Sequence, residues 1–297
     1  MTFEELLGKY RLTALAPTLG RYVSPAIAFA LTDLPNTRSV FGGTPLVPND
    51  FEWPTYTPPQ LEYPPALLNG LGIAQPPDPV PRALDFLLQL DLAALPSLGA
   101  TNPLPTQGLL TFFYDCVNQP WGYDPAHQDG FQVVLLDGDD LSPRLPPAPP
   151  LEPRGVVLSR GETLPHIGSH AYDELAAEID LPDNYFEFVS ELERGVSRRE
   201  GGNHRLFGHS ANVQGDMQLE AQLVSHGLYC GDSSGYLDPQ ATLLEAGAPD
   251  WILLLQLDSD DAAQLMWGDM GMLYFWIRRQ DLAARRFDRV WCTLQCG

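Results

Sequence analysis

Three segments of this chain recur in the same order about 165 residues further along the sequence. The pairs are LDFLLQLD at Leu84–Asp91 with WILLLQLD at Trp251–Asp258, LPTQGLLTFFYD at Leu104–Asp115 with MWGDMGMLYFWI at Met266–Ile277, and FGGTPLVPND at Phe41–Asp50 with FGHSANVQGD at Phe207–Asp216. Because the pairs are collinear, chance similarity of one apolar run does not account for them. Repetition at one large separation indicates duplication of a whole structural unit and not a short-period solenoid.

The first half contains short apolar and aromatic runs bounded by turn residues, which is the pattern of β-strands. Leu84–Asp91, Gly108–Asp115 and Phe131–Asp137 each fit this pattern. Near-continuous apolar strands are expected where both faces of a sheet are covered, and two copies packed about a pseudo-twofold axis would provide that cover. The sequence therefore predicts an α+β fold that is mainly β, with internal duplication of a β-rich half and a few peripheral helices.

We expect a single domain over residues 1–297 with four parts. These are an N-terminal helical segment (1–37), a first β-rich copy (38–140), a proline-rich connector with helices (141–202) and a second β-rich copy (203–297). In the first part, Thr2 and Glu5 have the spacing of a capping box, and Pro17 and Gly20 are expected to end the helix.

Two proline-rich stretches interrupt the strand pattern. Asn49–Pro81 is expected to be loop or extended irregular structure, because proline cannot donate to a strand ladder. Leu141–Gly155, with the sequence LSPRLPPAPPLEPRG, predicts a semi-stiff polyproline connector between the copies. Helical spacing returns from about Ala171 to Arg199, with Gly195 closing the second helix.

Acidic residues outnumber basic residues by 38 to 17, so the net charge is −21. Binding to a phosphate backbone needs a concentrated basic surface, so nucleic acid is not an expected partner. A strongly acidic face suits a basic partner protein, although the same charge also serves plain solubility. Lys9 is the only lysine, which excludes a Walker-type phosphate loop and Schiff-base chemistry elsewhere in the chain.

We expect a soluble cytoplasmic protein that binds no membrane. No apolar stretch reaches the roughly 18 residues of a membrane span. The acidic, amphipathic start MTFEELLGKYRL lacks the basic and apolar regions of a secretory signal. Four cysteines in 297 residues do not make a disulfide framework. The oligomeric state is left open.

The repeated Gln-Leu-Asp motif supplies a first candidate site. Gln89 and Asp91 share one strand face, as do Gln256 and Asp258, because strand side chains alternate with period two. If the copies meet about a twofold axis, these side chains would converge at the seam between them. Asp91 and Asp258 are then catalytic candidates, as a carboxylate pair with one raised pKa. Gln89 and Gln256 are ligand-binding candidates.

A structural explanation of the same motif stands beside the catalytic one and is favoured. Each glutamine can bond strand backbone, and each aspartate can end its strand or cap the turn that follows. A symmetric pair of aspartates also argues against catalysis, because an acid and a base usually need different environments.

The FGG and FGH turns give a second candidate site. Glycine permits close approach of the backbone to a ligand, so Gly42, Gly43 and His209 are candidate lips of a small-ligand pocket. Trp53 follows the repeated segment Phe41–Asp50 and is a further ligand-binding candidate, since aromatic residues in proline-rich loops are typical of recognition surfaces. The favoured role for Trp53 is to pin an irregular segment onto the core.

Three further motifs support no additional chemistry. GDSSG at Gly231–Gly235 matches the G-x-S-x-G consensus of a nucleophile elbow, but no histidine follows it to complete a triad in the α/β-hydrolase order. His204 and His209 with Cys230 lack the spacings of structural zinc, so no metal site is expected. Gly70-Leu-Gly72 lacks the third glycine of a dinucleotide fingerprint, and no cofactor is expected.

Taken together, FGGTPLVPNDFEWP, LDFLLQLDLAALP, LPTQGLLTFFYD, HRLFGHSANVQGD, WILLLQLDSDD and GDMGMLYFWI resemble successive signatures of the YwqG-like family, a bacterial domain of unknown function. The resemblance runs from about Ser39 to the C-terminus. It implies a mixed α/β structure with an internal duplication, and it implies no activity. Some members lie near genes for secreted toxins, which implies an accessory or immunity role by analogy. The stretches Tyr56–Pro81 and Leu141–Pro153 depart from a compact family pattern.

The favoured hypothesis is a non-enzymatic protein-binding or accessory module, immunity-like by analogy, whose acidic surface meets a basic toxin or effector. One alternative is an acid–base hydrolase-type enzyme centred on Asp91 and Asp258. The other is a small-ligand binder with its site at the seam between the copies. Absence of catalysis is favoured because no workable catalytic constellation is found in the sequence.

Overall fold

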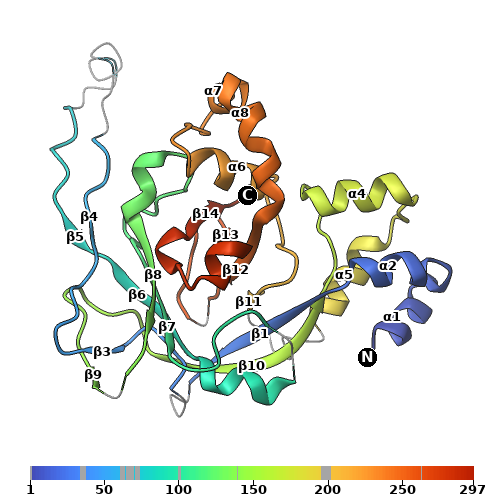
Figure 1. The fold of residues 1–297 in the computed structure, drawn as a ribbon, viewed down its shortest axis with the longest axis horizontal. Coiled ribbons are helices and arrows are strands. Elements are labelled where there is room, and N and C mark those ends of the chain that lie inside the picture. The colour runs from blue at the N-terminus through green and yellow to red at the C-terminus, as the bar shows by residue number, and fades with distance from the viewer. Residues whose placement is uncertain are drawn as a thin grey trace.

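The computed structural model describes residues 2–33, 38–60, 64, 70, 74–99, 102–138, 140–194, 202–261 and 263–297. Gly72 and Gly195, which the sequence analysis singled out, lie outside these residues. The protein is mainly β, with one large, nearly closed antiparallel sheet and several helices (Figure 1).

In the described part of the chain the main sheet has ten strands. Their order is β14 (Trp291–Gln295), β13 (Met272–Arg278), β12 (Trp251–Asp258), β11 (Arg205–Leu206), β1 (Ser24–Thr32), β10 (Arg154–Thr163), β2 (Val40–Phe41), β6 (Asp85–Asp91), β7 (Leu109–Tyr114) and β8 (Phe131–Leu136). Strands β6, β7, β8, β12 and β13 lie where the apolar runs predicted them.

The two central strands, β1 and β10, were not predicted. They pair along their length, from Ser24 opposite Thr163 to Thr32 opposite Gly155. Residues 1–37 therefore do not form a purely helical segment, and the proline-rich connector ends where β10 begins at Arg154. The last proline of that stretch is Pro153, and free backbone N–H groups for strand pairing follow it.

The sheet curls until its two edge strands meet. The ring of Phe131 at the start of β8 contacts the ring of Trp291 at the start of β14, with centroids 5.4 Å apart. Leu294 of β14 also donates a backbone hydrogen bond to the carbonyl of Trp121 at 3.0 Å. The concave face encloses one large apolar core drawn from both halves of the chain.

The strand order is the same when it is followed outward from either central strand. β1 is followed by β11, β12, β13 and β14, while β10 is followed by β2, β6, β7 and β8. Both long hairpins carry a register shift at matching places. One shift lies between Phe86 and Leu88, and the other lies between Leu253 and Leu255.

In the structure, the residues of the FGG and FGH turns that match by strand register differ by one position from those that match by sequence letters. Val40 lies opposite Gln89, and Arg205 lies opposite Gln256, so Val40 corresponds to Arg205. The residues with positive φ are Gly42 (+61°) and Gly43 (+68°) in the first turn, and Phe207 (+59°) and Gly208 (+76°) in the second. Backbone conformation therefore pairs Gly42 with Phe207, whereas the matching letters pair Phe41 with Phe207.

Two small ribbons cover the outside of the first half. β3 (Leu46–Pro48) pairs with β9 (Leu141–Pro143), and β4 (Thr55–Tyr56) pairs with β5 (Arg82–Ala83). These segments belong to the stretches predicted as irregular structure and connector. Short two-stranded ribbons tolerate proline because one edge of each strand makes no ladder bonds.

The helices α1 (Phe3–Lys9), α2 (Ala16–Tyr22), α4 (His170–Glu178) and α5 (Tyr185–Arg194) form a helical lobe with its own apolar core at one end of β1 and β10 (Figure 1). The capping box of Thr2 and Glu5 is confirmed. The prediction that Pro17 and Gly20 end the helix is wrong, because Pro17 lies in the first turn of α2 and Gly20 lies within it. Proline is tolerated there because the first helical N–H groups lack partners.

The second half also contains helices that the sequence analysis missed. These are α6 (Met217–Val224), α7 (Ser234–Leu237), α8 (Pro239–Leu244) and α9 (Arg279–Ala283). Short 3-10 turns complete the fold: η1 (Thr13–Leu15), η2 (Leu92–Leu98), η3 (Pro125–Gly130), η4 (Glu245–Asp250) and η5 (Phe287–Arg289). Among the described residues, no helix has the length and apolar character that crossing a membrane requires.

Candidate functional site

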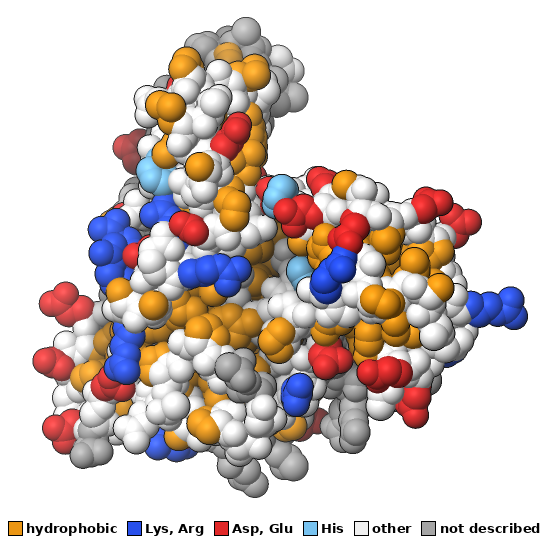
Figure 2. Space-filling view, turned by 45° about the vertical axis from the view of Figure 1, so that its right-hand side comes forward, with side chains coloured by type: hydrophobic (Ala, Val, Ile, Leu, Met, Phe, Trp, Pro, Cys, Tyr) orange, Lys and Arg blue, Asp and Glu red, His pale blue; other side chains and the backbone are white. Residues whose placement is uncertain are grey.

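A cleft of about 620 Å³ lies between the helical lobe and the second half of the sheet. The start of β1, the start of α4 and the Phe207–Ser210 turn line one side, and α6, η4 and β12 line the other. Figure 2 shows hydrophobic side chains and histidines around a hollow beside the helical lobe. Pockets of roughly 300–1,000 Å³ commonly bind small molecules, so this cleft is the candidate site.

The Phe207–Ser210 turn is held in an unusual conformation. Phe207 has a φ of +59°, a region that bulky residues rarely adopt. Gly208 follows with a φ of +76°, and a Cβ atom on it would lie 2.5 Å from the hydroxyl of Thr163. That hydroxyl accepts a 2.8 Å hydrogen bond from the backbone N–H of His209. Glycine is therefore required at position 208, both for its φ and for the close approach of β10.

The ring of His209 is oriented by the end of α2. Its Nε2 lies 2.8 Å from the carbonyl oxygen of Tyr22. Because a carbonyl only accepts, Nε2 carries the proton and Nδ1 is left with an acceptor lone pair. Burial lowers the pKa of His209 to about 4, so the ring is neutral at physiological pH. His209 thus brings a neutral hydrogen-bond acceptor to the cleft.

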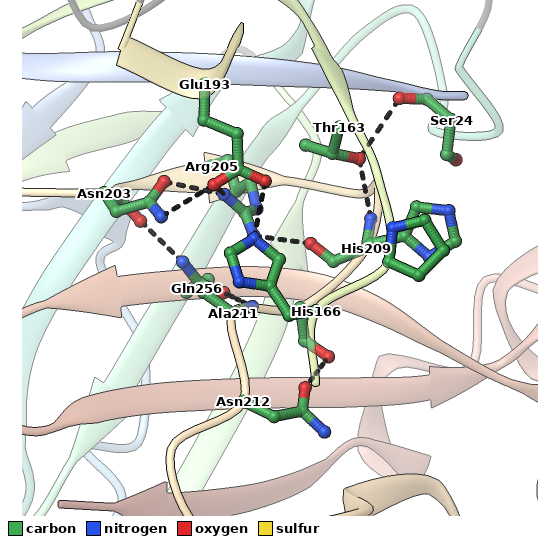
Figure 3. Close-up of polar contacts among 12 residues, drawn as sticks. Ser24, Thr163, His166, Glu193, Asn203, Arg205, His209, Ala211, Asn212 and Gln256 are labelled. Carbon is green, nitrogen blue, oxygen red and sulfur yellow. Dashed lines mark hydrogen bonds and ion pairs between the residues drawn. The ribbon is translucent and has the colours of Figure 1, made fainter. Parts of the chain in front are cut away.

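A buried polar network lies behind the turn, and Figure 3 shows Glu193, Asn203 and His166 gathered around Arg205. Arg205, only 2% exposed, donates to Glu193 at 2.9 Å and to Asn203 at 2.6 Å. It also donates to the carbonyl of His209 at 2.5 Å. Because the guanidinium bridges α5 and the turn, it fixes the lip of the cleft to the helical lobe.

The electrostatics of this network favour a charged Glu193. Burial by itself raises the pKa of that carboxyl group, but the charges of Arg205 and His166 outweigh burial and hold it at about 2. His166 contributes through its Nε2, which lies 2.8 Å from Glu193 Oε1. Removal of the charge of Glu193 or of Arg205 would leave the other charge buried without its partner.

The remaining lining combines apolar surface with charges of both signs. Trp251 and Trp276 belong to β12 and β13 and are almost fully buried, so they provide a rigid apolar wall. Arg279 lines the cleft and makes no ion pair with any described residue. Asp216, at the start of α6, also lines the cleft, and burial raises its pKa while the backbone hydrogen bonds of the helix N-terminus oppose that rise. This lining suits an amphipathic ligand.

No nucleophile and base meet at the described surface of this cleft. The hydroxyl of Ser210 donates to Asn212 at 2.5 Å, and the protonated nitrogen of His209 is committed to Tyr22. Ser233, the central serine of GDSSG, occupies the N-cap position of α7 without a side-chain hydrogen bond to the helix, and it does not line the cleft. Among the described residues, no group of three or more His, Cys, Asp and Glu side chains is placed to hold a metal ion.

The two repeated glutamines lie on the outer face of the sheet and not in the cleft. Gln89 accepts from the N–H of Leu46 at 3.0 Å and donates to the carbonyl of the same residue at 2.9 Å. Gln256 accepts from the N–H of Ala211 at 2.9 Å and donates to the carbonyl of Asn203 at 2.8 Å. Each glutamine therefore ties a covering segment to its own half of the sheet.

The structure does not bring Asp91 and Asp258 together. β11, β1, β10 and β2 lie between their strands, so the carboxylate pair required by the acid–base hypothesis is not formed. Asp91 caps η2 by accepting from the N–H of Ala93 at 3.2 Å. Asp258 ends β12 and accepts from the N–H of Asn203 at 2.7 Å, while burial raises its pKa. Both contacts are those of the structural explanation.

The first turn and Trp53 are also separate from the cleft. A Cβ on Gly42 would meet the carbonyl of Glu152 at 2.7 Å, and one on Gly43 would meet Pro153 at 2.8 Å, so this turn packs against the connector. Trp53 donates its indole N–H to the carbonyl of Leu84 at 2.8 Å and packs edge to face on Phe113. His209 is thus the candidate from the sequence that lines the cleft.

Sequence reasoning missed the residues that support the cleft. Glu193 looked like one of several acidic residues in an amphipathic helix, and Arg205 preceded the FGH letters that drew attention. The sequence letters set Arg205 against Ser39, and only the strand register of the structure sets it against the apolar Val40. Sequence comparison therefore gave no signal for the buried partner of Arg205.

No curated protein matches the chain. The narrower YwqG-like resemblance stays a prediction. However, a family model matches residues 39–296, which is most of the 297 residues. The chain therefore belongs to the family described as a domain of unknown function, DUF1963.

Proposed function

We propose that the protein is a non-enzymatic binding protein whose cleft takes a small organic molecule with an apolar body and polar ends. The observation that carries this proposal is the Phe207–Ser210 turn, a conformationally strained segment that lines a cavity of about 620 Å³. It corresponds to the small-ligand alternative of the sequence analysis, with the FGH turn at the site and the FGG turn elsewhere.

Strain at Phe207 supports a role in binding. A non-glycine residue in the left-handed region costs about 1–3 kcal/mol, and such residues cluster at ligand sites. At the corresponding position of the other half the chain has Gly42, which adopts φ +61° without that cost. A bulky ring in this conformation is explained if it forms part of the ligand surface.

The polar groups indicate what the ligand presents. His209 offers an acceptor, and Arg279 offers a positive charge that no described carboxylate neutralises. Between them Trp251 and Trp276 form an apolar wall. A ligand with a hydrogen-bond donor, an apolar centre and an anionic end would meet all three.

The test is a thermal-shift screen of small organic acids, followed by calorimetry of the hits. Hits should bind wild type and lose at least about tenfold in affinity in Phe207→Ala and Arg279→Gln, since each variant removes one ligand contact. Arg289→Gln, an exposed arginine outside the cleft, is the matched control. Hits that bind all variants equally would place the ligand elsewhere and refute the proposal.

A second candidate function is recognition of a basic partner protein by the acidic surface in the cytoplasm. The observation that favours it is the net charge of −21, and the family resemblance supports an accessory or immunity-like role. Charge-driven association weakens steeply with ionic strength. A complex isolated at low salt should therefore dissociate between about 50 and 500 mM salt, and one that does not would contradict charge recognition.

We also propose that the two halves arose by internal duplication. The matching strand order, the matching register shifts and the glutamine contacts of both halves support it. In a crystal structure, one rotation should superpose β2, β6, β7 and β8 on β11, β12, β13 and β14. Failure of a single rotation to do so would reject duplication as the origin of the fold.

A further inference from the structure

A second cavity, of about 340 Å³, lies on the other side of α6, against the edge strand β14. Its lining includes two carboxyl groups, three aromatic rings and a threonine: Asp216, Glu220, Trp121, Tyr123, Tyr236 and Thr293. We propose that this cavity binds a primary alkylammonium ion, with its N–H groups on the carboxylates and the threonine and its carbon chain along the aromatic rings. Asp216 lines both this cavity and the cleft, but the inference does not depend on a ligand in the cleft.

Among the described residues, no cationic side chain lines this cavity; Asp216 accepts a backbone hydrogen bond from the N–H of Gln218 at 3.2 Å as the cap of α6. Asp216 and Glu220 lie one turn apart on the same face of α6, at the start of the helix. The described lining contains no lysine, arginine or histidine, and neither carboxyl group makes an ion pair with a described residue. Glu220 accepts one hydrogen bond, from the hydroxyl of Tyr236 at 3.3 Å. A cationic ligand would supply the missing charge.

The threonine hydroxyl is the independent sign of a ligand. Thr293 is 1% exposed, and its Oγ1 has no hydrogen-bond partner. Side chains two apart on a strand share a face, and Gln295 accepts from the N–H groups of Val213 and Gln214 at 3.0 Å on that face. Thr293 is therefore turned toward the segment that leads into α6. Buried polar atoms are rarely left unpaired, and an ammonium N–H would satisfy this one.

The aromatic rings suit the carbon chain and the charge of such a ligand. The backbone carbonyl of Trp121 accepts from Leu294 at 3.0 Å, and that of Tyr123 accepts from Cys230 at 2.8 Å, so both residues are held at the cavity. Tyr236 approaches from α7 on the opposite side. An ammonium within about 6 Å of aromatic faces gains cation–π attraction.

Glu220 also makes the site pH-dependent. Burial raises its pKa to about 7, the charge of Asp216 adds to that rise, and the hydrogen bond from Tyr236 opposes it. The other titratable groups that face the pair are Cys230, from the loop between α6 and α7, and, near Asp216, His170 and Asp173 from α4. An alkylammonium stays charged throughout this range. Its affinity should therefore rise about tenfold from pH 6 to pH 8 as Glu220 ionises.

The experiment is calorimetric titration of the full chain with n-butylammonium chloride, and with n-butanol as a neutral probe of similar shape, at constant ionic strength. We expect butylammonium to bind with the stated pH dependence and butanol to bind at least about tenfold more weakly. Glu220→Gln should abolish the pH dependence. Thr293→Val should weaken binding several-fold without lowering the melting temperature, because the hydroxyl has no partner in the free protein.

Glu245→Gln, an exposed lining residue of the cleft, is the matched control and should bind butylammonium as wild type does. Equal binding of butanol and butylammonium, or no binding of either, would overturn the proposal. An unchanged pH profile in Glu220→Gln would do the same. If Glu220→Gln does not fold, Thr293→Val decides, since wild-type affinity in that variant also overturns it.

Discussion

The ring of Phe112 on β7 contacts the ring of Phe275 on β13 edge to face, with centroids 5.2 Å apart. Both side chains are fully buried, and they occupy matching positions of the two hairpins. The contact joins the two halves at the middle of the shared core. The halves are therefore expected to unfold together.

Replacing either phenylalanine with leucine should test this contact. Each single variant should lose about 1–2 kcal/mol of unfolding free energy through lost burial and a small cavity. A double-mutant cycle in urea should show a coupling energy of about 0.5–1.5 kcal/mol. Each single variant already removes the ring-to-ring contact, so the double variant does not lose it a second time. Purely additive losses would mean that the two rings stabilise their halves independently.

Glu193→Gln should destabilise the protein by about 3 kcal/mol, because it leaves the buried guanidinium of Arg205 without its charge partner. Glu191→Gln is the matched control. It removes a partly exposed ion pair with Lys9, in which the lysine is 51% and the glutamate 22% exposed, and should cost less than about 1 kcal/mol. Similar losses from the two variants in chemical denaturation would show that the buried network adds little stability.

Two groups should each lose their contribution to stability as the pH falls, in two separate windows, while Glu220, whose pKa burial raises to about 7, opposes this by favouring the folded state as it takes up a proton below pH 7. The folded pKa of His209, about 4, is below its unfolded value of about 6.5, so the unfolded state binds the proton first and stability drops from pH 6.5 to 4. Glu193 is also depressed, to about 2, so its contribution is present above pH 4.5 and is lost as the pH falls toward 2.

The two windows can be assigned by one variant. Compared with wild type, His209→Gln should lose less unfolding free energy as the pH falls from 6.5 to 4, and it should leave the lower window in place. A variant with the wild-type slope in the upper window would show that another group titrates there. Urea denaturation at closely spaced pH values provides the measurement.

Gly208→Ala should cost about 3 kcal/mol, because alanine is strained at φ +76° and its Cβ would collide with the hydroxyl of Thr163. Gly99→Ala is the matched control, since Gly99 has φ +63° with open space around the added carbon. That variant should cost only about 1 kcal/mol. Equal melting temperatures for the two variants would remove the argument that close approach of β10 shapes the turn.

Trp53→Phe should cost about 1 kcal/mol, because the bond from the indole N–H to the carbonyl of Leu84 is lost while packing on Phe113 remains. Affinity for ligands of the cleft should not change, since Trp53 does not line it. A loss of ligand affinity with little loss of stability would instead make Trp53 a recognition residue.

Local sequence signals predicted the elements whose pattern is self-contained. β6 and β12 are apolar runs bounded by polar or turn residues, and α1 carries its own capping box. β1 and β10 were not predicted as strands, because their residues mix small, polar and apolar side chains without a clear alternation. They are strands because each pairs with the other and with a neighbour on its far side.

In the candidate site, too, local sequence signals identified single residues, while long-range contacts decided which residues lie together. The FGH letters drew attention to His209, but the contacts of that turn are with Tyr22, Thr163 and Arg205, which lie in three different elements. Sequence similarity joined Asp91 to Asp258, yet the curved sheet holds them in separate networks. Residues alike in sequence were kept apart, and unlike residues were brought together.

The sequence alone determined the strands of the two hairpins, because alternation and burial act within a few residues of one another. It also determined a single large net charge and the presence of two similar series of segments. Only the tertiary structure decided which side chains share a cavity. The curl of the sheet and the docking of the helical lobe set those distances, and both depend on contacts between residues far apart in the chain.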